Sequence, residues 1–214
     1  MIERTIYAQI LHSISLRPVT LITGARQVGK TTLCLKLRDE KGINYVCLRD
    51  KKERMMARND PDTFLKLHPH PLIIDEVQYA PSLLESIESV VDRMKEEGKT
   101  NKGMFVLTGS QAYKLMEGVS DSLAGRISVI NMSPLSLNEI IGRDTPPFDI
   151  DIDKNIKRSS GFSIGPREFY ERLIRGTYPE PEVEPNLTTQ EFYSDYMDTY
   201  IDKDVSEIIN VVNK

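Results

Sequence analysis

Apolar and polar positions alternate in blocks along the N-terminal part of the chain. Five runs rich in apolar or β-branched residues predict buried strands, at 19–22, 43–48, 71–76, 104–108 and 127–130. The stretches between them have helical periodicity or a helix-favouring composition, and they predict helices over 2–15, 32–38, 50–57, 62–67 and 81–98. Strands that alternate with helices in this way are typical of an α/β domain built on a parallel sheet. We expect that domain to span residues 1–141.

The pattern changes at Gly142. Residues 142–165 are rich in proline, serine, glycine and aspartate, which predicts a linker or a long loop. Helical signals return over 166–214, where a capping box of Thr188 and Glu191 starts a long helix with an acidic polar face. We therefore expect a helical appendage in this part of the chain. Its acidic face argues against contacts with phosphate groups.

Composition narrows the classes of protein that fit the chain. The 214 residues carry a net charge of -4, which argues against a broad nucleic-acid-binding surface. Cys34 and Cys47 belong to no metal-ligand pattern, and we interpret both as small core residues in a reducing compartment. No apolar run has the length of a signal peptide or of a transmembrane helix. We therefore expect a cytoplasmic protein, with neither nucleic acid nor a membrane as a partner.

The first candidate binding site is the segment between the first predicted strand and the helix that follows it. Its sequence, GARQVGKT at 24–31, fits the phosphate-binding pattern G-x-x-x-x-G-K-[ST]. The two glycines let the backbone curl around a polyphosphate, with its N–H groups and the start of the helix directed at the anion. Lys30 would contact the β- and γ-phosphates, and Thr31 would bind Mg²⁺. The expected nucleotide-binding residues are Gly24, Ala25, Arg26, Gln27, Val28, Gly29, Lys30, Thr31 and Thr32.

A second candidate lies where the strand predicted at 71–76 ends in two carboxylates, Asp75 and Glu76. A buried strand tolerates acids at its end, where a metal ion or a ligand offsets their desolvation. Asp75 would hold Mg²⁺, directly or through water, and Glu76 would polarise an attacking water. Because ligands bind at the carboxyl ends of parallel strands, we expect these acids to meet the phosphate-binding segment there.

Two further groups near strand ends leave alternatives open. Ser110 follows the strand predicted at 104–108. It either contacts a γ-phosphate or orients water, or it caps a helix predicted at 111–116, and these roles are compatible. Arg126 precedes the fifth predicted strand, where it could reach a γ-phosphate of its own or of a neighbouring chain. From spacing alone, a surface salt bridge is the more common role for such an arginine.

Taken together, these segments resemble the bacterial and archaeal AAA-type P-loop ATPases that often carry a C-terminal domain of unknown function. The matching stretches are TGARQVGKTTL, LIIDEVQYAP, FVLTGSQ, SLAGRI followed by MSPLSLNEI, GTYPEP and FYSDYMDTYIDKDV, in the family's order. The resemblance implies a three-layer α/β/α core with a five-stranded parallel sheet in the order 5-1-4-3-2. It also implies that Thr108 or Ser110 senses the γ-phosphate and that Arg126 is an arginine finger or sensor. Family members usually continue into a further domain, so we expect 166–214 to lead toward one.

The expected function is Mg²⁺-dependent binding and hydrolysis of ATP. The preference for ATP is implied by the resemblance, and the chain has no N-K-x-D guanine motif. The alternative is a nucleotide-dependent switch or scaffold with little turnover, in which ATP reorients the helical appendage toward a partner. A small-molecule kinase is a weaker alternative, because the sequence has no signature of an acceptor pocket. Another copy of the chain or an unidentified protein could complete the site. The expected catalytic residues are Lys30, Asp75, Glu76, Ser110 and Arg126, and the expected metal ligands are Thr31 and Asp75.

Overall fold

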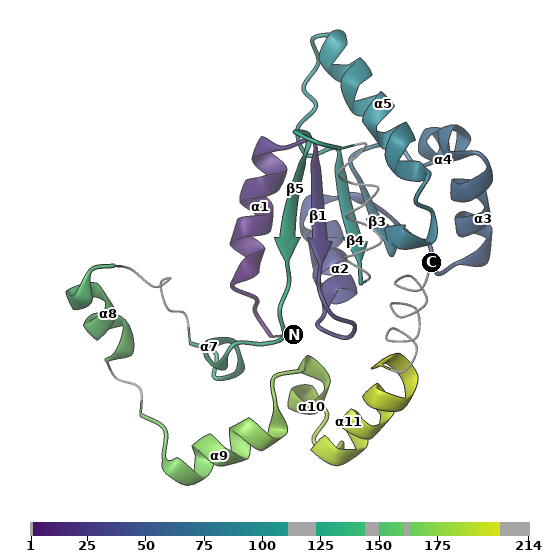
Figure 1. Ribbon diagram of the computed structural model, residues 1–214. Helices are drawn as coiled ribbons and strands as arrows, with labels where there is room; N and C mark the ends of the chain where they lie inside the picture. The colour runs from purple at the N-terminus through teal and green to yellow at the C-terminus, as the bar shows by residue number, and fades with distance from the viewer. Residues whose placement is uncertain (1, 111–122, 144–149, 161–162, 202–214) are drawn as a thin grey trace, which may run out of the picture. The chain divides into compact units, whose positions relative to one another are not determined.

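The computed structural model describes residues 2–110, 123–143, 150–160 and 163–201 of the chain. These residues form two compact units (Figure 1). The larger unit comprises Thr5–Ser133, and the smaller one comprises residues 2–4 together with the described residues from Pro134 onward. The division of the chain into 1–141, 142–165 and 166–214 stays a prediction.

The larger unit is built on a five-stranded sheet in which all the paired strands run parallel (Figure 1). The strand order is β2-β3-β4-β1-β5, which is the predicted order 5-1-4-3-2 read from the other edge. The predicted fold class is therefore confirmed. The strands are β1 (Val19–Thr23), β2 (Asn44–Cys47), β3 (Leu72–Asp75), β4 (Phe105–Gly109) and β5 (Ile127–Asn131).

The helices of this unit begin and end largely where the sequence signals place them. Asp50 accepts hydrogen bonds from two N–H groups of the first turn of α3, and Asp60 caps α4, which has a proline at its first position. Gly42 adopts a left-handed conformation, with φ of 64°, and ends α2. The helical segments are α1 (Ile6–Leu16), α2 (Lys30–Lys41), α3 (Lys51–Asn59), α4 (Pro61–Leu67), the 3-10 turn η1 (Val77–Tyr79) and α5 (Leu83–Glu96).

One face of the sheet carries the main apolar core. Side chains alternate between the two faces of a strand, so every second residue contributes to this core. Leu21, Ile74 and Leu107 from the central strands are fully buried there. Helices α3, α4 and α5 cover this face. Their core side chains are Ala57, Phe64, Leu65, Leu83, Leu84, Ile87 and Val91.

Helices α1 and α2 belong to the other face of the sheet. The hydroxyl of Thr20 in β1 lies 2.8 Å from that of Ser13 in α1, and α2 contacts β2 and β3. Alternation along each strand also places Tyr45, Asp75 and Thr108 on this face. Two helical layers therefore enclose the sheet, and the polar strand residues share a face with the helix that follows the phosphate-binding segment.

The smaller unit is helical among its described residues. The capping box of Thr188 and Glu191 is present, as predicted, at the start of α11. The rest of the long helix predicted after it, beyond residue 201, lies outside the described residues. The segment 142–165, predicted to be a linker or a long loop, contains α8, whose first turn is capped by the Asp151 side chain. The polar composition of this segment did not indicate a helix. The helices are α7 (Leu137–Ile140), α8 (Ile152–Ser159), α9 (Pro166–Arg175), α10 (Pro179–Val183) and α11 (Thr189–Tyr196), followed by a π-helical turn, η2 (Met197–Ile201).

Within the described ranges, no helix is both long enough and apolar enough to cross a membrane.

Candidate functional site

The phosphate-binding segment forms a tight loop between β1 and α2. Its backbone has positive φ at Gly24 (141°), Gln27 (60°) and Gly29 (100°). Val28 is fully buried and attaches the loop to the core, whereas Ala25, Gln27 and Thr32 are exposed. Arg26 and Thr31 are half-buried. All the predicted nucleotide-binding residues therefore lie together at the carboxyl end of β1.

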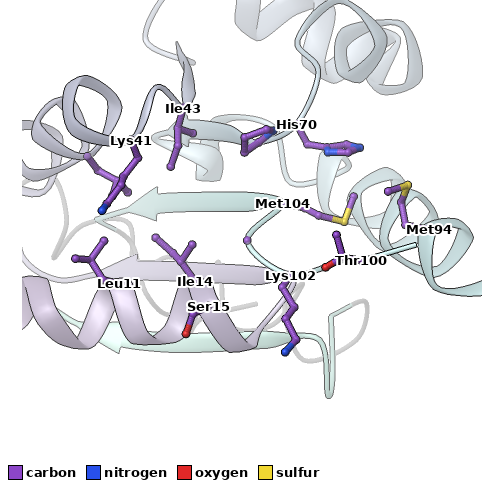
Figure 2. A pocket seen from close by; sticks show the side chains of 13 residues that line it. Leu11, Ile14, Ser15, Lys41, Ile43, His70, Met94, Thr100, Lys102 and Met104 are labelled. Atoms are coloured by element: carbon purple, nitrogen blue, oxygen red, sulfur yellow. The ribbon is translucent and has the colours of Figure 1, made fainter. Parts of the chain in front are cut away.

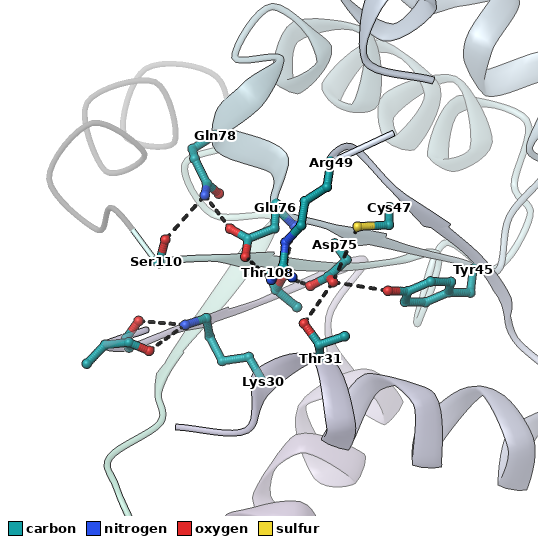
Figure 3. A network of polar contacts seen from close by, with 12 residues as sticks. Lys30, Thr31, Tyr45, Cys47, Arg49, Asp75, Glu76, Gln78, Thr108 and Ser110 are labelled. Carbon is teal, nitrogen blue, oxygen red and sulfur yellow. Dashed lines mark hydrogen bonds and ion pairs between the residues drawn. The ribbon is translucent and has the colours of Figure 1, made fainter. Parts of the chain in front are cut away.

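Lys30 begins α2, and its side chain turns back toward the loop. Its Nζ donates hydrogen bonds to the carbonyl oxygens of Gly24 (2.8 Å) and Ala25 (2.7 Å), as Figure 3 shows. Only 6% of Lys30 is exposed. Burial lowers the pKa of this ammonium group, while the carboxylates of Glu76 and Asp75 act in the opposite direction. The lysine is thus a buried cation whose carboxylate neighbours come from the second predicted motif.

Gly24 is a position where a side chain cannot be accommodated. A Cβ atom built there would overlap the backbone carbonyl oxygen of Met132, and φ of 141° is unfavourable for any L side chain. We expect Gly24→Ala to lower the free energy of unfolding by about 2–4 kcal/mol, measured by urea denaturation. Gly42→Ala is the matched control, because Gly42 also has positive φ but nothing within 4 Å of its Cβ position. Equal losses in the two variants would contradict the clash.

Four side chains donate to the carboxylate of Asp75, at the carboxyl end of β3. Thr31 and Tyr45 donate to Oδ2 at 2.9 Å and 3.0 Å, and the Cys47 thiol lies 3.7 Å from the same oxygen. Thr108 donates a short hydrogen bond to Oδ1. Asp75 is 1% exposed, so these donors take the place of water around its charge. The two predicted metal ligands, Thr31 and Asp75, are thus in direct contact.

Tyr45 and Cys47 belong to this cluster but were not among the predicted site residues. The two residues stand two positions apart in β2, so their side chains point to the same face. Cys47 pairs with Asp75 in the register of β2 and β3. Burial raises the pKa of both groups, and the Asp75 carboxylate acts in the same direction, so both remain protonated donors at neutral pH. The predicted strand order, combined with alternation along the strand, could have identified them.

Glu76 follows β3 in a left-handed conformation, with φ of 62° and ψ of 48°. This backbone is uncommon outside glycine, asparagine and aspartate, and such strain clusters at functional sites. Arg49, just beyond β2, donates to Oε1 of Glu76 at 2.6 Å, and Gln78 donates a short hydrogen bond to Oε2. The Glu76 N–H donates to Oγ1 of Thr108 at 3.0 Å. Both carboxylate oxygens of Glu76 are therefore engaged.

Ser110 joins this network from the end of β4. Its Oγ accepts a hydrogen bond from Nε2 of Gln78 at 3.3 Å (Figure 3). The helix predicted at 111–116, which Ser110 could cap, lies outside the described residues. The structure thus brings Ser110 to the same strand ends as Asp75 and Glu76.

Arg126 lies at the opposite, amino ends of the strands. Its carbonyl oxygen accepts the N–H of Val19, at the amino end of β1, whereas the loop at 24–29 leaves the carboxyl end, about 13 Å further along the strand. Its guanidinium bonds Asp92 of α5 at 2.7 Å and 2.6 Å, and Glu88 at 3.1 Å. The salt-bridge alternative is therefore observed, and Arg126 does not lie beside the predicted nucleotide-binding residues of its own chain. A role toward a neighbouring chain stays a prediction.

A separate cavity of about 610 Å³ lies near the amino ends of β2, β3 and β4 (Figure 2). Among the described residues, those that line it include none of the predicted nucleotide-site residues. This cavity is therefore distinct from the polar cluster at the carboxyl ends of the strands. Its walls are largely apolar and include Leu11, Ile14, Leu37, Ile43, Pro71 and Met104.

Two curated relatives from mycobacteria match part of the chain. They are the uncharacterized proteins Mb2031c of Mycobacterium bovis and Rv2008c of Mycobacterium tuberculosis, each 30% identical to it over 140 residues. The match covers 64% of this chain and 30% of each relative, so it spans less than a third of their length.

A solved structure and a family model bear on the fold and the family. The Walker-type ATPase PABY2304 of Pyrococcus abyssi is similar to all of this chain, over 76% of its own length, with 15% identity and a TM-score of 0.57. At that identity the likeness concerns the fold. A family model described as AAA domain matches residues 16–141, which include the phosphate-binding loop and all five strands. The chain therefore belongs to the family of AAA-type P-loop ATPases.

Proposed function

We propose that the chain binds ATP with Mg²⁺ at the carboxyl ends of β1, β3 and β4 and hydrolyses it. The observation that carries this proposal is the convergence of the loop lysine Lys30, the pair of Thr31 and Asp75, and the adjacent carboxylate of Glu76. These groups supply a cation for phosphate oxygens, oxygen ligands for a divalent metal ion and a proton acceptor for water. Such a set suits attack of water on a γ-phosphate.

The donor groups of Thr31 and Asp75 fit a magnesium ion. Mg²⁺ prefers oxygen ligands, and Oγ1 of Thr31 lies 2.9 Å from Oδ2 of Asp75. In P-loop ATPases the hydroxyl at this loop position and the acid at the end of the neighbouring strand share the ion. When bound, the ion neutralises charge on the β- and γ-phosphate oxygens. Thr31 and Asp75 would hold it here, with Tyr45 and Thr108 orienting the Asp75 carboxylate.

The remaining roles belong to groups of the loop and the strand ends. Lys30 would exchange its bonds to the Gly24 and Ala25 carbonyls for bonds to phosphate oxygens, and the loop N–H groups would bind the same anion. Glu76 would accept a proton from the attacking water. Ser110 would contact the γ-phosphate. The preference for ATP over GTP belongs to this proposal as well.

We also propose that a second copy of the chain completes the site. Arg126 stands too far from Lys30 to act within one chain, but it lies on the surface, where a neighbouring copy could receive it. An arginine that reaches a γ-phosphate in this way stabilises the charge of the transition state. Its guanidinium is paired with Asp92 and Glu88 of its own chain, so these ion pairs would open when it reaches a neighbouring site.

Steady-state ATPase activity measured against protein concentration tests the proposed function. We expect the specific activity to rise with concentration, because each site needs a neighbour. Chains with Arg126→Ala and chains with Glu76→Gln should each be inactive alone and recover activity when mixed, since one supplies the arginine and the other the acid. Activity that is independent of concentration would contradict completion by a second copy. Absence of turnover with tight binding of ATP would contradict hydrolysis.

A nucleotide-dependent switch is a second candidate, favoured by the ion pair between Arg49 and Glu76. Their N–O distance is 2.6 Å, and the hydrogen bond to Glu76 raises the pKa of Arg49. While Oε1 of Glu76 is held in this ion pair, it is not free to contact an attacking water. The chain would then hold ATP with little turnover until this pair separates.

Arg49→Ala distinguishes the two candidates. Under the switch, we expect the variant to raise basal ATP turnover several-fold, because Oε1 of Glu76 is then released from the ion pair and can contact water. Arg167→Ala, which removes an exposed ion pair with Glu171 on α9, is the control and should leave turnover unchanged. Turnover that falls in the Arg49 variant would assign this arginine to the active arrangement and count against the switch.

A further inference from the structure

We propose that Gln78 is a positioning residue that couples Ser110 to the carboxylate of Glu76. The inference rests on the proposed function, because it concerns how the water-activating group is oriented. Gln78 lies in η1, the 3-10 turn that begins directly after Glu76. The left-handed backbone of Glu76 turns the chain, and the N–H of Tyr79 donates to the carbonyl oxygen of Glu76 at 3.1 Å. This turn brings the Gln78 side chain back to the residue two positions before it.

The amide of Gln78 bridges two strand ends. Nε2 donates one hydrogen bond to Oε2 of Glu76, at the end of β3, and another to Oγ of Ser110, at the end of β4 (Figure 3). An amide nitrogen carries two hydrogens, so both are used. The pair of contacts links the residue proposed to activate water with the residue proposed to contact the γ-phosphate.

The orientation of this amide is set by charge. Oε1 of Gln78 is buried and has no hydrogen-bond partner among the described residues. Reversing the amide would place Oε1 against the carboxylate oxygen of Glu76, where like partial charges repel. Burial of an unsatisfied acceptor is unfavourable, and the fold accepts it here while directing the N–H groups at Glu76 and Ser110. The donor group of Gln78 is therefore the part that the site uses.

The hydroxyl of Ser110 can transmit a contact through this bridge. Because its oxygen accepts from Gln78, its own hydrogen remains available to donate to a phosphate oxygen. A phosphate, Ser110, Gln78 and Glu76 would then be joined by hydrogen bonds, and the two bonds on either side of the Ser110 hydroxyl would strengthen each other. Binding of the γ-phosphate would in this way hold the Glu76 carboxylate in one orientation.

A double-mutant cycle on ATP turnover tests the coupling. We expect Gln78→Leu to lower kcat by about tenfold to a hundredfold with KM within about threefold of wild type, since the lost bonds act on the reacting water. In the Gln78→Leu background, Ser110→Ala should add less than half of its effect, on a logarithmic scale, in the wild-type background, since the bridge is already broken. Gln9→Leu, the same change at an exposed position of α1, is the control.

A second variant, Gln78→Glu, distinguishes the loss of this coupling from a loss of turnover caused by unfolding. It preserves the size of the side chain but replaces the donor with a second carboxylate, so kcat should fall further than in the leucine variant while ATP still binds. Additive effects in the cycle, or wild-type kcat in both Gln78 variants, would overturn the coupling and leave the proposed function standing. A wild-type chain that binds ATP without turnover would overturn the proposed function, and this inference with it.

Discussion

Glu76→Gln is expected to lower the ATP turnover number by a factor of about 10² to 10⁴ while ATP binding stays near wild type. The change keeps the shape of the side chain and removes the group that would accept a proton from water. The phosphate-binding loop, Lys30 and the pair of Thr31 and Asp75 are untouched. Affinity for Mg²⁺-ATP by titration calorimetry and turnover by phosphate release provide the two readings.

The fold should tolerate this substitution. Arg49, the ion-pair partner of Glu76, has a side chain that is 59% exposed, and pairs with an exposed partner contribute little to stability. The new amide can still accept a hydrogen bond from Arg49. Its N–H₂ group could also donate to Oε1 of Gln78 if that amide reverses, which would satisfy an oxygen that now has no partner among the described residues.

The matched control is Glu85→Gln, which makes the same chemical change at an exposed position in the first turn of α5. It should leave both affinity and turnover unchanged. Wild-type turnover in the Glu76 variant would remove this residue as the water-activating group. Loss of binding together with turnover would instead place Glu76 among the groups that hold the nucleotide.

Lys30→Ala is expected to weaken ATP binding by at least about a hundredfold, because the loop loses the buried ammonium proposed to contact the β- and γ-phosphates. Hydrogen bonds to charged groups contribute about 1.5–3 kcal/mol each, and a phosphate would receive more than one from Lys30. Fluorescence anisotropy of a labelled ATP analogue, titrated with protein in the presence of Mg²⁺, measures the change.

Stability should change little in this variant. Burial lowers the pKa of Lys30, so its ammonium group is less favourable in the folded chain than in the unfolded one. Removing the ammonium relieves that cost and offsets the loss of its bonds to the carbonyl oxygens of Gly24 and Ala25. We expect the free energy of unfolding to stay within about 1 kcal/mol of wild type.

The control for this experiment is Lys51→Ala, at an exposed position at the start of α3. Unchanged ATP affinity in the Lys30 variant, with the control also unchanged, would refute the assignment of the phosphate-binding loop. A large loss of stability in the Lys30 variant would make the affinity measurement a report on folding, and the urea midpoint identifies that case.

Much of the site followed from local patterns in the chain. The loop at 24–31 could be identified because the glycines, the lysine and the threonine of the phosphate-binding pattern lie close together in the chain. Asp75 and Glu76 were recognisable because acids at the end of an apolar run are unfavourable without a ligand or partner. Continuous apolar or β-branched runs predicted the five strands, and helical periodicity or a helix-favouring composition predicted the main helices.

Local patterns in the sequence did not predict which side chains of neighbouring strands contact one another. Tyr45 and Cys47 reach Asp75 only through the register of β2 against β3, and Arg49 reaches Glu76 because the two strands end side by side. The bridge through Gln78 depends on the left-handed turn at Glu76. Local composition does not indicate any of these contacts. Most of the partners are far apart along the chain, and the contact of Gln78 with Glu76 depends on the backbone conformation of Glu76.

The sequence by itself therefore determined the alternation of strands and helices, the phosphate-binding loop and the two acids, because each depends on residues close together in the chain. Only the tertiary structure, in which β4, β1 and β5 pair in parallel, established that Ser110 and Arg126 lie at opposite ends of the strands. Arg126 adjoins a strand, as Ser110 does, but it precedes its strand whereas Ser110 follows one. In a parallel sheet, the position before a strand and the position after a neighbouring strand lie at opposite ends of the strands. The arginine is therefore separated from the acids by the length of a strand.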